Sequence, residues 1–249
     1  IRSIDRKVAV EIFTTNYDLL LEQALDELEI PYFDGFVGSR RSFFDLRAVE
    51  HNLIPKHWSR LWKIHGSINW YQETINKQGK VFRSSEIKSD ASHLIYPSHL
   101  KYEESRKMPY LALVDQLNRF IRRKSSFLIL SGYSFNDGHL NDTIVNALKA
   151  NPTAMVLGLL FETYEKKTED GSAVSRYPKA YPLAMSQHNL NIWTYDRAII
   201  GTNLGSWAYN KEKDDGESDL RSFIHHQIDP DDAEKHKLLL NMGDFSVLT

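Results

Sequence analysis

Short uninterrupted apolar runs alternate along the chain with longer segments in which apolar residues recur at helical spacing. The runs predict strands at residues 8–14, 61–64, 127–130, 155–161 and 190–194. The helical spacing predicts helices at residues 19–28, 108–124, 139–149 and 181–187. Uninterrupted apolar strands that alternate with helices are typical of a parallel sheet covered on both faces. The pattern therefore predicts an α/β fold whose parallel sheet is flanked by helices.

The polar segments between these elements predict loops. Residues 29–60 are rich in loop-forming residues, residues 72–92 indicate an exposed loop or hairpin, and the charged residues 162–176 indicate a mobile loop. A further strand is expected at His93–Tyr96, where Pro97 would end it. Residues 210–219 are strongly charged. We therefore expect one domain over residues 1–209, followed by a charged linker and C-terminal segment over residues 210–249.

The composition argues against several classes of function and site. The formal net charge is −2 and no basic stripe is present, so direct nucleic-acid binding is not expected. No apolar run approaches the ~20 residues of a membrane span. The chain has no cysteine, which excludes disulfides and cysteine-ligated zinc and fits a reducing compartment. We predict no metal site.

Three polar clusters directly follow predicted strands: Thr14–Asp18, His65–Asn69 and Ser131–Asn141. In open α/β sheets such turns gather at the carboxyl edge and can share one pocket. Each cluster also has a simpler interpretation. Asn16 or Asp18 could only cap the following helix, His65 could be structural, and the third cluster could be ordinary turn and cap chemistry.

The three clusters together resemble the motifs of a known family. TTNYD resembles the TxN-x-D motif of sirtuins and, with its tyrosine, the variant in bacterial sirtuin-like NADases. KIHGSINW is similar to the segment that carries the sirtuin catalytic histidine, and SGYSFNDGHLND is similar to the third family motif. The resemblance spans roughly residues 8–207. It implies a Rossmann-like sirtuin fold with NAD⁺ as the substrate.

The resemblance also implies roles for individual residues. Asn16 would position the attacking group beside the nicotinamide ribose, and His65 would act as the base. Asp18 would contact the nicotinamide amide. The implied NAD⁺-binding residues are Thr15, Asp18, Gly66, Ser131, Gly132, Ser134 and Asn203. The chemistry suits these side chains, because nicotinamide leaves as a neutral group and a histidine can accept a proton near neutral pH.

The chain departs from the family pattern in three ways. The family opens with a strand and a Gly-Ala-Gly type loop that wraps the pyrophosphate, and nothing before Val8 resembles it. We expect that strand and loop upstream of Ile1. Protein-deacylating sirtuins usually carry a four-cysteine zinc module, and its absence favours NAD⁺ hydrolysis over deacylation. The segment between Asn16 and His65 is longer than in ordinary sirtuins, which indicates an insertion.

The function implied by the resemblance is hydrolysis of NAD⁺ to nicotinamide and ADP-ribose, commonly used for bacterial antiphage defence. It implies a cytoplasmic homo-oligomer whose partner is a HerA-type ATPase or another defence sensor protein. Two alternatives stay open. The chain could be an NAD⁺-dependent protein deacylase, or a non-catalytic module that senses NAD⁺ or ADP-ribose.

Overall fold

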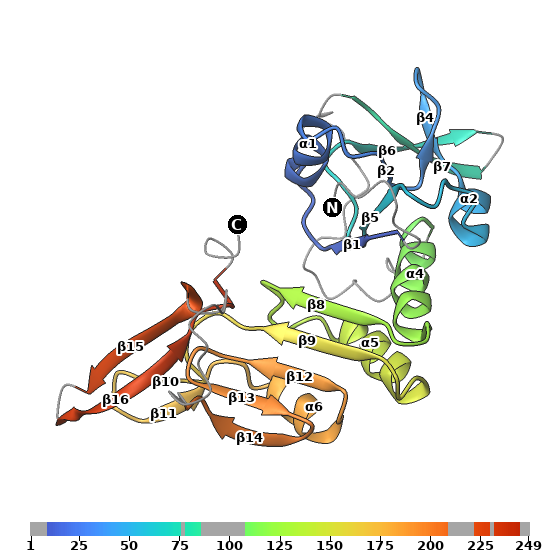
Figure 1. Ribbon diagram of the computed structural model, residues 1–249. Coiled ribbons are helices and arrows are strands. Elements are labelled where there is room, and N and C mark those ends of the chain that lie inside the picture. Colours follow the sequence, from blue (N-terminus) through green and yellow to red (C-terminus); the bar gives the residue numbers. More distant parts are fainter. Residues whose placement is uncertain (1–8, 76–77, 86–107, 209–221, 230–231, 245–249) are drawn as a thin grey trace. The chain divides into compact units, whose positions relative to one another are not determined.

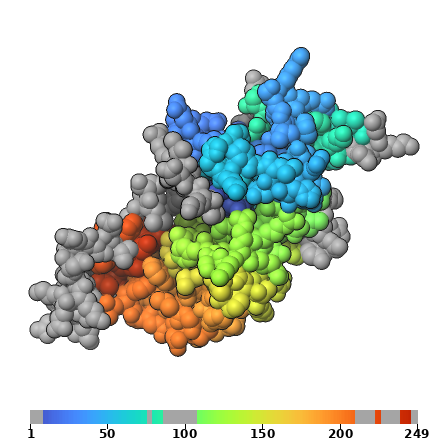
Figure 2. Space-filling model, turned by 45° about the vertical axis from the view of Figure 1, so that its right-hand side comes forward, coloured from blue at the N-terminus to red at the C-terminus, as the bar shows by residue number. Residues whose placement is uncertain are grey.

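The computed structural model describes residues 9–75, 78–85, 108–208, 222–229 and 232–244 (Figure 1). The chain forms two compact units that divide between Leu117 and Asn118. The surface of the first unit, blue to cyan in Figure 2, carries a narrow projection formed by the turn at residues 38–41, whose side chains at positions 39–41 are exposed. Both units combine strands and helices, as the hydrophobic pattern predicts.

The first unit contains an entirely parallel three-stranded sheet in the order β1-β5-β2. Its strands are β1 (Glu11–Thr14), β5 (Ser59–Lys63) and β2 (Tyr32–Phe33). Helix α1 (Leu20–Glu27) follows β1 and packs Leu25 against Leu61 and Ile30. The strands expected at residues 8–14 and 61–64 and the helix expected at residues 19–28 are therefore confirmed.

A second, antiparallel sheet lies in the same unit, and the sequence indicated only its last hairpin, as one of the two interpretations of residues 72–92. Its order is β3-β4-β7-β6, with β3 (Phe36–Val37), β4 (Ser42–Phe44), β7 (Gln78–Arg83) and β6 (Trp70–Ile75). Helix α2 (Leu46–His51) also falls within residues 29–60, so the expectation of a loop-rich segment is wrong there. Strands β3 and β4 are only two or three residues long, too short for a period to be visible. The strand expected at His93–Tyr96 lies outside the described residues.

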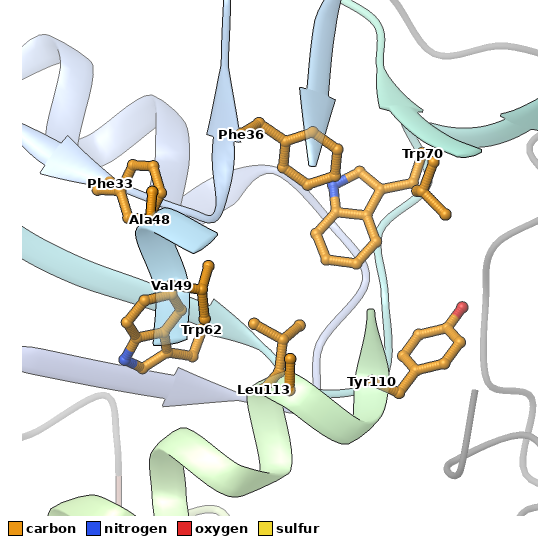
Figure 3. Close-up of a cluster of buried hydrophobic side chains, with 10 residues drawn as sticks. Phe33, Phe36, Ala48, Val49, Trp62, Trp70, Tyr110 and Leu113 are labelled. Carbon is orange, nitrogen blue, oxygen red and sulfur yellow. The ribbon is translucent and has the colours of Figure 1, made fainter. Parts of the chain in front are cut away.

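Aromatic side chains join the elements of the first unit in one buried cluster (Figure 3). Trp62 of β5 and Trp70 of β6 are almost fully buried, and Phe36 packs on Trp70 with ring centroids 4.9 Å apart. Leu113, from the start of α4 (Tyr110–Arg122), is fully buried in the same cluster. Each large apolar side chain buried in this way stabilises the fold by about 1.5–3 kcal/mol.

The second unit is built on a five-stranded sheet in the order β14-β13-β12-β9-β8. Its strands are β8 (Phe127–Ser131), β9 (Met155–Leu159), β12 (Leu190–Trp193), β13 (Arg197–Ile200) and β14 (Asn203–Ser206). Its helices are α5 (Gly138–Ala150) and α6 (Ala180–Ser186). The first three strands are parallel, whereas β13 and β14 run antiparallel to their neighbours. The sheet is therefore mixed rather than wholly parallel.

Two further expectations for this unit are wrong. Strand β8 is not covered on both faces, since Phe127 and Ile129 are about half exposed. Phe127, Ile129 and Ser131 alternate with the buried Leu128, so the exposed side chains lie on one face of the strand. Residues 162–176 are not an irregular loop but contain the hairpin β10 (Glu165–Lys167) and β11 (Ala173–Ser175).

The C-terminal segment adds a hairpin of β15 (Ile224–Asp229) and β16 (Asp232–Leu240). The Leu240 N–H donates to the Tyr195 carbonyl at 2.7 Å, so the end of β16 is bound to the turn after β12. Among the described helices, none has the length and apolarity that a membrane crossing requires.

Candidate functional site

The register of β1 and β5 places the first two polar clusters at one edge of one sheet. Thr14 pairs with Lys63 in a parallel ladder, and the Ile64 N–H donates to the Thr14 carbonyl at 2.9 Å. Asn16 lies two residues after Thr14, and His65 lies two residues after Lys63. Neighbouring strands are about 4.8 Å apart, so the two residues leave adjacent strand ends. The structure therefore places at neighbouring strand ends the two residues to which the family resemblance assigns the chemistry.

The loops after β1 and β5 are also hydrogen-bonded to each other. The Tyr17 carbonyl accepts from the Ile68 N–H at 3.0 Å and from the Ser67 hydroxyl at 3.3 Å. Lys63, only 1 % exposed, donates to Glu22 at 2.7 Å and to the Ser67 hydroxyl at 2.9 Å. Its ammonium also contacts the carbonyls of Tyr17 and Asp18. The two loops thus form one bonded structure around a buried cation.

Sequence reasoning missed Lys63 and Glu22. The signal was present, because a lysine interrupts the apolar run of residues 61–64, two residues before His65. A charge at such a position is rarely buried without a partner. Glu22 lies in the first turn of α1, where an acidic residue also complements the helix dipole and gives no separate signal.

Asn16 and Asp18 differ in what surrounds their side chains. Asn16 is exposed, and its backbone N–H donates to the Thr14 hydroxyl at 3.1 Å, which fixes the backbone of the turn. Asp18 accepts from the Leu20 N–H at 3.1 Å through Oδ1, as in an Asx turn, and the N-cap of α1 is Leu19 rather than Asp18. The contact of Asp18 with nicotinamide stays a prediction. Thr15, which precedes Asn16, is half-buried.

His65 is 8 % exposed, so its imidazole is enclosed by the protein. Gly66 follows with φ of 86°, a left-handed conformation that favours glycine, and its N–H donates to the Lys63 carbonyl at 3.1 Å. Gly66 is itself buried. Its local role is therefore the tight turn that orients His65, and its contact with NAD⁺ stays a prediction.

The third cluster lies in the second unit, at the end of β8. Ser131, Gly132 and Ser134 are exposed. Gly132 has φ of +68°, and a side chain added there would meet nothing within 4 Å. A ligand could therefore approach this backbone closely. Asp137 caps α5 by accepting from the N–H groups of His139 and Leu140.

A partly buried tyrosine holds this loop in shape. The Tyr133 hydroxyl donates to Asn141 Oδ1 at 2.8 Å, and Asn141 Nδ2 donates to the Phe135 carbonyl at 2.8 Å. Burial raises the pKa of the Tyr133 hydroxyl, and the nearby Asp137 adds to the effect, so the hydroxyl stays protonated as a donor. The hydrogen bonds of Tyr133 and Asn141 therefore hold the loop that carries the exposed Ser131 and Ser134.

The structure does not bring Asn203 together with this loop. Asn203 begins β14, the opposite edge strand, four strand spacings or roughly 19 Å across the sheet from β8. Strand β13 runs back along β12, and the Gly201 N–H donates to Asn191 Oδ1 at 3.0 Å. The turn at Asn203 thus lies near the amino end of β12, whereas Ser131 lies at the carboxyl end of β8.

A small cavity of about 180 Å³ lies after β9, lined by Phe161, Glu162, Lys166, Arg176 and Tyr177. Arg176 and Glu162 form an ion pair at 2.5 Å. The sequence did not indicate this cavity, because the charged residues that form it were interpreted as a loop. No cluster of three or more potential metal ligands occurs in the part of the chain that the structure describes.

Comparison with known proteins supports the resemblance. A family model described as "SIR2-like domain" matches residues 10–179, which is more than half of the chain. The match includes the loops after β1, β5 and β8, and ends before Asn203. No curated protein matches the chain.

Proposed function

The chain belongs to the SIR2-like domain family, and from this premise we propose that it hydrolyses NAD⁺ at the bond between nicotinamide and ribose. SIR2-like domains use NAD⁺. One observation carries the proposal: Asn16 and His65 follow the adjacent carboxyl ends of the neighbouring strands β1 and β5. Asn16 offers an exposed amide, and His65 offers an imidazole that the protein encloses.

The chemistry needs both groups. Water attacks the anomeric carbon, the carbon–nitrogen bond breaks, and its electron pair leaves with nicotinamide as a neutral molecule. The products are nicotinamide, ADP-ribose and one proton. The Asn16 amide holds the attacking water, and the His65 imidazole accepts the proton that this water loses. A positioned general base contributes about 10²–10⁴-fold to such a step.

From the family resemblance we also propose that the loop after β8 contacts the rest of the dinucleotide. Gly132 leaves its backbone uncovered, and Ser131 and Ser134 offer exposed hydroxyls beside it. The amino end of α5 follows directly, and helix amino ends favour anions such as phosphate. Thr15, Asp18 and Gly66 are proposed contacts of the nicotinamide half.

The absence of cysteine supports hydrolysis over peptide deacylation, because the four-cysteine zinc module of protein-deacylating sirtuins cannot form here. We place the activity in bacterial antiphage defence, in a cytoplasmic homo-oligomer that works with a HerA-type ATPase or another sensor protein. NAD⁺ depletion would then be the output of that assembly.

The test is to measure nicotinamide and ADP-ribose by chromatography after incubation with NAD⁺, with and without an acylated peptide. We expect release without peptide. Release only in the presence of peptide, together with transfer of the acyl group, would instead identify a deacylase. Tight NAD⁺ binding by calorimetry without turnover would identify a sensing module.

A further inference from the structure

Lys63 lies where the two proposed catalytic loops meet, although the mechanism gives it no contact with substrate. It is the last residue of β5, and its side chain is 1 % exposed. The ammonium has three hydrogens to donate. Around it lie four acceptors, namely Glu22 Oε1, the Ser67 hydroxyl and the carbonyls of Tyr17 and Asp18.

These acceptors belong to both loops. Tyr17 and Asp18 immediately follow Asn16 in the loop after β1, and Ser67 is two residues beyond His65 in the turn after β5. Ser67 also links the loops directly, because it accepts from Lys63 and donates to the Tyr17 carbonyl. Lys63 therefore joins the backbone that carries Asn16 to the turn that carries His65.

Glu22 balances the buried charge from α1. Its Oε1 is 2.7 Å from the Lys63 ammonium. Its Oε2 is buried and has no hydrogen-bond partner within the described ranges. Removal of Lys63 alone would therefore leave a buried carboxylate without its counter-charge, which is strongly destabilising. Removal of both charges together avoids that penalty.

We propose that Lys63 is a positioning residue, whose ammonium sets the Asn16 amide and the His65 imidazole in the relative geometry that bond cleavage requires. The inference rests on the proposed NAD⁺ hydrolysis. A displacement of about 1 Å between reacting groups can lower a rate by about 100-fold. The bonds of Lys63 to carbonyls of one loop and a hydroxyl of the other restrict such displacement.

The decisive variant is Lys63→Met combined with Glu22→Leu, which removes both charges. We expect this double variant to melt near the wild-type temperature, with kcat lowered roughly 10–100-fold and KM nearly unchanged. Lys63→Met alone should melt lower than the double variant. The control is Lys56→Met, which removes an exposed lysine of the same unit and should leave both kcat and melting unchanged.

Hydrogen exchange separates this inference from the proposed function. In the double variant, the amides of residues 15–19 and 65–69 should exchange faster, while those of β1 and β5 stay protected. Unchanged exchange of the two loops, or unchanged kcat in the folded double variant, would overturn the positioning role. If the wild type does not cleave NAD⁺, the proposed function fails, and the exchange measurement still decides whether Lys63 orders the loops.

A smaller change keeps the inference testable if the double variant does not fold. Ser67→Ala leaves the ion pair of Lys63 and Glu22 intact and removes one bridge between the loops. We expect kcat to fall roughly 2–10-fold, as the loss of one hydrogen bond predicts, with faster exchange of the same amides. Wild-type values for both measurements would overturn the inference.

Discussion

Thr14 and Lys63 are register partners in the parallel ladder of β1 and β5, so Asn16 and His65 start from neighbouring strand ends although a long segment separates them along the chain. The hydrogen bond from the Ile68 N–H to the Tyr17 carbonyl, 3.0 Å long, continues the pairing beyond the strands. Side chains on the two loops can therefore act on one ligand without a rearrangement of the sheet.

Asn16→Ala is the first test of this arrangement. The side chain is exposed, so its removal should change the free energy of unfolding by no more than about 0.5 kcal/mol. Loss of the amide that holds the attacking water should lower kcat for NAD⁺ cleavage about 100-fold or more. Steady-state kinetics and thermal melting measure the two effects. Asn146→Ala, an exposed position of α5, is the matched control, and equal turnover in both variants would reject the role of Asn16.

His65→Ala should lower the rate of NAD⁺ cleavage by about 10²–10⁴-fold, the usual contribution of a general base. Because the imidazole is buried, we also expect a loss of stability of about 0.5–3 kcal/mol. Circular dichroism and urea unfolding establish whether the variant is folded. A folded variant that retains wild-type turnover would show that His65 is structural.

The hydrophobic pattern predicts those elements of the fold that are long enough to show a period. Helices α1, α4 and α5 begin and end within two residues of the expected positions, and the strands before Thr14, Lys63 and Ser131 are all present. The pairing of β4 with β7 was missed because it crosses a long segment of the chain, whereas the β6–β7 hairpin lies where the sequence indicated a loop or hairpin. Pairing between distant short strands leaves no local signal.

The same reasoning explains what could be predicted about the site. Positions that follow a parallel strand lie at one edge of its sheet, so the pairing of the Asn16 and His65 loops follows from strand direction. Asn203 shows the limit of this rule. It also follows a strand along the chain, but β13 is antiparallel, so its turn lies at the other end of β12. Order along the chain does not reveal that reversal.

Tyr133→Phe tests the bonds behind the third cluster. The variant removes the donor to Asn141 Oδ1 and leaves a mostly buried amide oxygen short of a partner. We expect the second unit to lose about 1–3 kcal/mol of stability, and the amides of residues 132–137 to exchange faster. KM for NAD⁺ should rise. The control is Tyr164→Phe in the same unit, whose ring stacks on Tyr181 and should keep that contact. Equal stability of the two variants would contradict the prediction.

Asp170 should titrate well below an ordinary aspartate. Hydrogen bonds from the hydroxyls of Thr168 and Ser172 and from the Ser172 N–H lower its pKa to about 2. Carbon-13 NMR of the carboxyl can follow this titration directly. Thr168→Val removes the largest cause and should move the pKa toward 3.8, whereas Thr163→Val, outside the turn, should not. A wild-type pKa near 3.8 that does not change in Thr168→Val would show that these hydrogen bonds do not form in solution.

Asp34 should make the first unit more stable as the pH falls. Burial raises the pKa of its carboxyl above 3.8, although the Arg83 guanidinium and the Phe36 N–H act in the opposite direction. The folded state therefore holds this proton more tightly than the unfolded state, and the resulting stability appears as pH falls through the raised pKa and is complete below 3.8. Urea midpoints of the wild type should rise relative to Asp34→Asn, which cannot titrate, between neutral pH and 3.8. A constant difference between the two proteins, or one of opposite sign, would show that the ion pair with Arg83 outweighs burial.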